Sequence, residues 1–121
     1  MATTAVRGFG GVDMAKYAVF FSFKGETIAH AIEHPTDRSA AVAKAAKAAG
    51  GSLEAYYWML GDPDGFCIVE MPDSAAVAAM SLAVSSSGAL SHVSTHELFD
   101  AKQVVGLLTK AKGIKGRYSP P

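Results

Sequence analysis

The run KYAVFFSF at residues 16–23 constrains the fold more than any other segment of the chain. It is nearly all apolar, and its aromatic and β-branched residues are typical of a buried strand. Successive side chains of a strand point to opposite faces, so a strand that is apolar throughout must be covered on both faces. Helices can cover one face, and something else must cover the other.

Helix and strand signals alternate after this run. A short helix is expected within 27–34, and 36–49 is the clearest helix in the chain, with Thr36 or Asp37 as its N-cap and Gly50 at its end. This second helix is rich in alanine, so it is expected to approach its sheet closely.

Three more strands and two more helices are expected further along the chain. The strands are 52–60, 65–71 and 89–99, with the turn GDPD between the first two. The helices follow the N-cap candidates Asp73 and Asp100. In the last helix, the residues expected to face inward are Val104, Leu107, Leu108 and Ala111.

This order predicts an α+β fold of the ferredoxin-like βαββαβ type with an additional C-terminal helix. Its four-stranded antiparallel sheet carries both helices on one face and leaves the other face open. The same face of a second copy would cover it in the manner of a dimeric α/β barrel, so a homodimer or a higher homo-oligomer is expected.

The length of 121 residues fits one domain. We expect a flexible N-terminal extension at 1–15, the domain at 16–112 and a flexible tail at 113–121. Half of the residues are hydrophobic and 18% are charged, which fits a globular domain with a core and some further apolar surface hidden between subunits.

Charge and cysteine content exclude several classes of protein. The 11 basic residues equal the 11 acidic ones, so no basic excess points to nucleic acid. The apolar runs fall short of the roughly 18 residues of a membrane span, and the N-terminus lacks the apolar region of a signal peptide. The single Cys67 forms no internal disulfide. A cytoplasmic location is therefore expected, with no membrane partner.

Several blocks of the chain resemble one family in order and spacing. They are AVFFSFKGETI, EHPTDRSAAVAKAAKAAGGSLEAYYWMLGDPDGFCIVEMPD and AMSLAVSSSGALSHVSTHELF. Over residues 16–112 the chain is similar to the GYD domain family of small bacterial proteins. That family is named for a Gly-x-Tyr-Asp turn after the second strand. Gly61 and Asp64 match the turn, whereas Pro63 stands at the tyrosine position.

The resemblance implies a ferredoxin-like fold related to the dimeric α/β barrels, but it implies no reaction. Families with that fold include cofactor-free monooxygenases, isomerases, haem enzymes and ligand-sensing domains, so the fold does not define the function. If the tyrosine is functional in relatives, Pro63 marks a lost or altered function here.

The hairpin 52–71 carries the strongest concentration of candidate site residues. A register that pairs Leu60 with Phe66 assigns alternate side chains to two faces. The face expected to be open holds Glu54, Tyr56, Trp58, Phe66, Ile68 and Glu70. The face expected in the core holds Ala55, Tyr57, Met59, Cys67, Val69 and Met71. A slip of one residue would move a whole strand to the other side.

Glu70 is the candidate general acid or base. Beside an indole and a phenol in a half-closed barrel, its carboxylate would be desolvated and its pKa raised. The alternative is structural: Glu70 accepts a hydrogen bond from Tyr56 or pairs with a lysine at the strand edge.

The histidines offer a second set of candidates. His92 and His96 lie on one face of the last strand, and either could shuttle protons as a catalytic residue near neutral pH. His30 and His34 have the i, i+4 spacing of helical metal ligands, but no further ligand supports a metal site. Neither a metal nor a cofactor is expected.

The segment KGETI leaves the first strand at a sheet end, where a loop can close over a pocket, so Lys24 and Thr27 are candidate ligand-binding residues beside the hairpin set. The leading hypothesis is a dimeric α/β barrel that binds a small organic molecule in a pocket lined by the open sheet face, and a cofactor-free enzyme is one form that such a protein could take. The alternatives are a non-enzymatic ligand-sensing or assembly module, and haem or metal binding through histidine.

Overall fold

The fold is described from a computed structural model that covers residues 14–121 in detail. The expected extension at 1–15 lies almost entirely outside the described residues. The elements in chain order are β1 (Ala15–Phe23), α1 (Gly25–Glu33), α2 (Ser39–Ala48), β2 (Ser52–Trp58), β3 (Gly65–Met71), α3 (Ser74–Ser85), β4 (Leu90–Leu98) and α4 (Ala101–Lys115). The last helix continues past residue 112, where the domain is expected to end.

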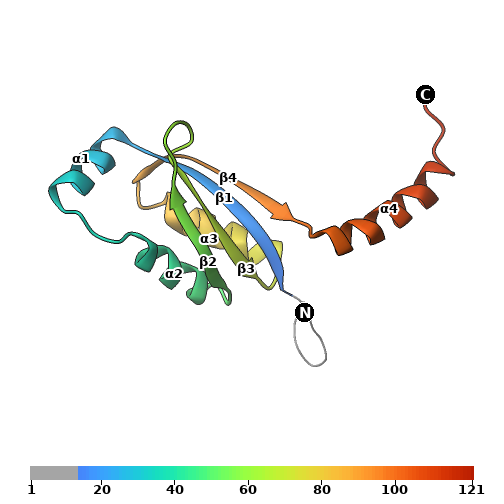
Figure 1. The fold of residues 1–121 in the computed structure, drawn as a ribbon, viewed down its shortest axis with the longest axis horizontal. Helices are drawn as coiled ribbons and strands as arrows, with labels where there is room; N and C mark the ends of the chain where they lie inside the picture. The colour runs from blue at the N-terminus through green and yellow to red at the C-terminus, as the bar shows by residue number, and fades with distance from the viewer. Residues whose placement is uncertain (1–13) are drawn as a thin grey trace.

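The strands form one four-stranded sheet in the order β2-β3-β1-β4, and all three neighbouring pairs are antiparallel. Helices α2 and α3 cover one face of this sheet, and α1 and α4 lie at opposite ends of the molecule (Figure 1). The order and the one-sided helix layer confirm the predicted ferredoxin-like α+β fold.

The core lies between the sheet and the α2–α3 layer. On β1, Tyr17, Val19 and Phe21 point into it, and Ala46 of α2 is fully buried against it. From α3, Val77 and Met80 enter the same core. The alternation along β1 follows from the pleat, because every second side chain shares a face.

The helix ends follow local chemistry, with one exception. Asp73 accepts a hydrogen bond from the Ala76 amide and caps α3, as predicted. Asp100 and Gln103 form a complete capping box at the start of α4. The N-cap of α2 is Arg38 rather than Thr36 or Asp37. Asp37 instead accepts hydrogen bonds from the amide and hydroxyl of Ser39.

The prediction that α4 packs inward is wrong within one chain. The helix contains no buried residue, and Val104, Leu107 and Leu108 are all exposed. In Figure 1, α4 leads away from the end of β4 rather than back onto the sheet. An amphipathic pattern predicts that a helix has an apolar face but does not determine which surface covers it.

Candidate functional site

The register of the β2–β3 hairpin differs from the predicted one, and the difference exchanges the faces of β2. The strands pair Tyr57 with Phe66 and Trp58 with Gly65, so the hairpin opens two residues before Leu60. A bulge at Glu54, between Leu53 and Ala55, then shifts the pairing once more. The placement of Tyr56 and Trp58 on the open face is therefore wrong.

Strand β3 has the predicted orientation. Cys67, Val69 and Met71 are buried on the helix side, and Phe66 lies on the open face. Tyr56 lies opposite Cys67 on the helix side, whereas Tyr57 lies opposite Phe66 on the open side. Leu60, predicted to be in the strand, is fully exposed in the loop that follows it.

A cavity of about 260 Å³ opens between the sheet and the helix layer. Its floor consists of sheet residues and its roof of side chains from α2 and α3, and most of its lining is apolar. The lining includes four residues with polar side chains, Arg38, Tyr56, Ser81 and Ser87, and the sulfur-containing Cys67 and Met80. A concave, mainly apolar space with a few polar groups is the usual form of a small-molecule site.

The hydroxyl of Tyr56 is one of several polar groups on the residues that line this cavity. It accepts a hydrogen bond of 2.9 Å from Trp58 Nε1, and the Tyr56 ring stacks on Phe21 with centroids 5.6 Å apart. Among the described residues, this hydroxyl donates its own proton to no partner. Burial raises the pKa of Tyr56, and the Trp58 hydrogen bond and the Arg38 charge partly oppose that rise. At neutral pH the phenol is a donor.

Arg38 contributes a permanent positive charge at the wall of the cavity. It lies at the N-cap of α2, and its charge acts on the Tyr56 phenol. In the described part of the chain it forms no ion pair. Arg38 could not be identified as a candidate from the sequence, because nothing in TDRS places the arginine at the wall of a cavity that Tyr56 also lines.

Cys67 reaches the cavity from β3 as a buried free thiol. Burial raises its pKa from 9.0 to about 11, so the side chain stays protonated at neutral pH. Its predicted position on the helix side is confirmed, and it packs there as a small apolar residue.

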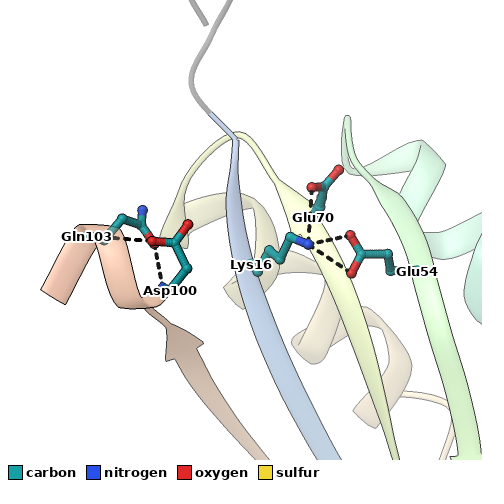
Figure 2. A network of polar contacts seen from close by, with 5 residues as sticks. All are labelled: Lys16, Glu54, Glu70, Asp100 and Gln103. Carbon is teal, nitrogen blue, oxygen red and sulfur yellow. Dashed lines mark hydrogen bonds and ion pairs between the residues drawn. The ribbon is translucent and has the colours of Figure 1, made fainter. Parts of the chain in front are cut away.

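The open face of the sheet carries an aromatic cluster and an ion-pair network. Phe66 packs between Phe20 and Tyr57, with ring centroids 5.6 Å away in each case. At one end of the face, Lys16 Nζ lies 2.9 Å from Glu54 and 4.0 Å from Glu70 (Figure 2).

The surroundings of Glu70 differ from those predicted. Because Tyr56 and Trp58 turn to the other side, Glu70 is not beside an indole and a phenol. Glu70 pairs instead with Lys16, which lies opposite it near the end of β1. This is the alternative in which Glu70 has a structural role. The hydrogen bond from Lys16 to Glu54 is the main cause that raises the pKa of the lysine. The catalytic role of Glu70 stays a prediction.

His92 and His96 share one face of β4, as their shared parity predicts, and that face is the open one. With Asp62 and Pro63 they line a wide hollow of about 530 Å³. The altered family turn and the two candidate histidines therefore meet at one place. His96 also contacts the Phe20 ring edge-on, with centroids 5.7 Å apart.

The KGETI segment is tied to the body of the domain. Thr27 Oγ1 donates a hydrogen bond of 2.7 Å to the Ala89 carbonyl, and the Lys24 amide donates to the same oxygen. Ala89 in turn lines the sheet–helix cavity. Thr27 thus positions one wall of the cavity, and contact of Lys24 or Thr27 with a ligand stays a prediction.

Asp64 of the family turn has a structural contact. Its carboxylate accepts a 2.8 Å hydrogen bond from the Phe23 amide, next to the irregular pairing of β1 with β4 at Ser22/Phe23. This bond satisfies an amide at a point where the ladder changes register.

No group of three or more His, Cys, Asp or Glu residues within 14–121 is arranged to hold a metal ion. The rings of His30 and His34 lie 4.7 Å apart between centroids, without a further ligand among these residues. None of the helices in this part of the chain is long and apolar enough to cross a membrane.

The structure defines a ferredoxin-like α+β domain with a cavity between its two layers. The chain belongs to the GYD domain family, whose profile matches residues 17–108. A crystal structure of a protein of unknown function from Nitrosomonas europaea is similar, with 19% sequence identity and a TM-score of 0.38. The match covers 73% of this chain and 91% of that one. No curated protein matches the chain.

Proposed function

We propose that this protein binds a small, largely apolar organic molecule in the cavity between the sheet and helices α2 and α3. The observation that carries the proposal is that Tyr56, with a free hydroxyl donor, and the charged Arg38 line the same mainly apolar cavity. Both groups attract a hydrogen-bond acceptor or an anion. The ligand class is therefore an aromatic acid, phenol or ketone.

The size of the cavity limits the ligand. Its volume of about 260 Å³ is slightly below the lower end of pockets that hold drug-sized molecules, roughly 300 Å³. A molecule with one or two rings is the appropriate size. The ring of Phe21 and the Met80 side chain supply apolar contacts on either side.

The cavity is better suited to binding than to proton transfer. The Tyr56 phenol and the Cys67 thiol are protonated at neutral pH, because their ordinary pKa values already lie above 7 and burial raises both further, and Arg38 stays charged. These groups orient a ligand without accepting a proton from it. This supports a ligand-sensing or carrier role over a catalytic one.

Titration calorimetry with 2-naphthoate, 2-naphthol and naphthalene tests the proposal. Loss of the phenol donor in Tyr56→Phe should weaken binding of 2-naphthoate about 10-fold or more, because a hydrogen bond to a charged group contributes roughly 1.5–3 kcal/mol. Naphthalene, which has no acceptor, should bind both proteins equally.

Tyr57→Phe is the matched control, because Tyr57 is adjacent in sequence and exposed on the opposite face of the sheet. It should leave every affinity unchanged. Equal losses in Tyr56→Phe and Tyr57→Phe, or no binding of any of the three compounds, would refute the proposal.

A further inference from the structure

Trp58 contacts the residues of the sheet–helix cavity from outside. It is the only tryptophan of the chain and is 49% exposed, and it is not among the residues that line the cavity. Its ring packs against that of Phe23 with centroids 5.0 Å apart, and Phe23 lies edge-on to Phe21 at 5.3 Å. Phe21 stacks on Tyr56, so the hydrogen bond from Trp58 Nε1 to the Tyr56 hydroxyl completes a circuit of four rings. The indole is therefore held both by its ring contact and by its N–H group.

The hydrogen bond between Trp58 and Tyr56 can have only one direction. An indole N–H donates and cannot accept, so the Tyr56 oxygen must accept this bond. The phenol proton then points away from the indole, and no residue in the described part of the chain accepts it. Accepting one hydrogen bond also polarises the hydroxyl and strengthens it as a donor. Trp58 thus keeps Tyr56 a donor toward a molecule in the cavity that Tyr56 lines.

The other polar side chains of the cavity lining offer a ligand few acceptors. The Ser87 hydroxyl donates a 2.7 Å hydrogen bond and accepts one of 3.2 Å, both with backbone groups near the end of α3. Ser81 Oγ lies 3.3 Å from Thr95 Oγ1, which engages that hydroxyl as well. A guanidinium carries donors and no acceptor, so Arg38 can only donate. Tyr56 and Arg38 therefore present protons, rather than lone pairs, to a ligand.

We propose that Trp58 determines the ligand specificity of the cavity, as a positioning residue that acts through Tyr56. Because its indole occupies the acceptor side of the Tyr56 hydroxyl, the cavity selects aromatic molecules with a hydrogen-bond acceptor, such as ketones and carboxylates. It rejects molecules of the same shape that carry only a donor, since their N–H would meet other donors and stay unpaired. This inference rests on the proposed binding function and names the feature that the ligand must present.

Quinoline and free indole are a matched pair of probes for this selectivity. Both are small fused two-ring molecules, but quinoline has a ring nitrogen that only accepts, whereas indole has an N–H that only donates. Titration of the full chain, followed by the chemical shifts of its amides, gives the affinity for each. The wild type should bind quinoline several-fold more tightly than indole. Naphthalene, with neither group, reports packing alone.

A tryptophan analogue with sulfur in place of the indole N–H, placed at position 58, removes the donor and keeps the ring. The Tyr56 hydroxyl can then turn and accept from free indole, so the preference for quinoline over indole should fall about 3- to 10-fold. Trp58→Phe should change the preference in the same direction. In a Tyr56→Phe background the analogue should have no further effect on the preference, because Trp58 acts only through that hydroxyl.

The outcomes separate this inference from the proposed function. A preference unchanged by the sulfur analogue, in a protein whose quinoline binding still depends on Tyr56, would overturn the role of Trp58 and leave the binding function standing. Equal weakening of quinoline, indole and naphthalene would show that Trp58 only packs, and would overturn its role in specificity as well. Failure of the wild type to bind quinoline at all would overturn both the binding function and this inference.

Discussion

Cys67 provides a quantitative test of how dry the space between sheet and helices is. The thiol is 3% exposed, and burial raises its pKa from 9.0 to about 11. Between these two pH values the unfolded chain releases the thiol proton and the folded chain retains it. The unfolded state therefore binds fewer protons, and the free energy of unfolding must fall as the pH rises.

The expected loss follows from the shift of about two pKa units, at 1.36 kcal/mol per unit. Raising the pH from about 8 to about 11 should lower the stability of the wild type by about 2–3 kcal/mol more than that of Cys67→Ala. Tyrosines and lysines titrate in both proteins, so their contributions cancel in the difference.

Urea unfolding at several pH values measures this difference directly. Below about pH 8 the two proteins should differ by a constant amount, since the thiol is protonated in both states. A difference that stays constant up to pH 11 would show that the Cys67 thiol is solvated in the folded state, and would refute the description of the cavity as apolar at its floor.

Substitutions at Asp64, Gly65 and Asp100 test three local contacts of the fold. Asp64→Ala removes the acceptor of the Phe23 amide and should lower the free energy of unfolding by about 1.5–3 kcal/mol. Asp64→Asn should lose less. Equal stability of the wild type and both variants in urea unfolding would contradict this role of Asp64. Gly65→Ala would place its Cβ 2.6 Å from the Tyr57 carbonyl and 2.7 Å from the Phe21 ring, so we expect a loss of about 1–3 kcal/mol or more by thermal unfolding. Gly25→Ala, with nothing within 4 Å of its Cβ, is the control and should be neutral or slightly stabilising. Asp100→Ala removes the N-cap of α4 and should lower the helix content measured by circular dichroism, without lowering the melting temperature of the sheet domain. A lower melting temperature of that domain would show that α4 packs on its own chain.

The element order and the helix-side face of β3 could be predicted from the sequence, because each depends on local patterns. Asp73 and Asp100 cap helices where capping chemistry predicts them, and Cys67 is buried as the alternation of β3 requires. The GYD family resemblance is confirmed by the match over residues 17–108.

The faces of β2 could not be predicted, because register depends on two small details. The hairpin opens after Trp58 instead of Leu60, and one extra residue at Glu54 forms a bulge. Each detail changes the pairing by a residue or more, and a shift by an odd number of residues moves the side chains of a strand to the opposite face of the sheet. Tyr56 and Tyr57 therefore exchanged faces, and the candidate site moved from the open face to the sheet–helix cavity.

The role of Arg38 and the position of α4 depend on tertiary structure. The charge of Arg38 acts on Tyr56 only because α2 packs over the sheet near β2, and no spacing in the sequence encodes that arrangement. The amphipathic pattern of α4 predicts an apolar face but does not determine which surface covers it, and no part of the described chain buries that face.

The most direct test of ligand binding in the cavity is the intermolecular nuclear Overhauser effect between 2-naphthoate and the side chains of the protein. Met80 lines the cavity on the helix side, and Phe66 and Tyr57 mark the open face. The cavity site predicts contacts from the naphthalene ring to the Met80 methyl group and none to Phe66 or Tyr57. Contacts to Phe66 or Tyr57 with none to Met80 would place the ligand on the open face and contradict the proposed site.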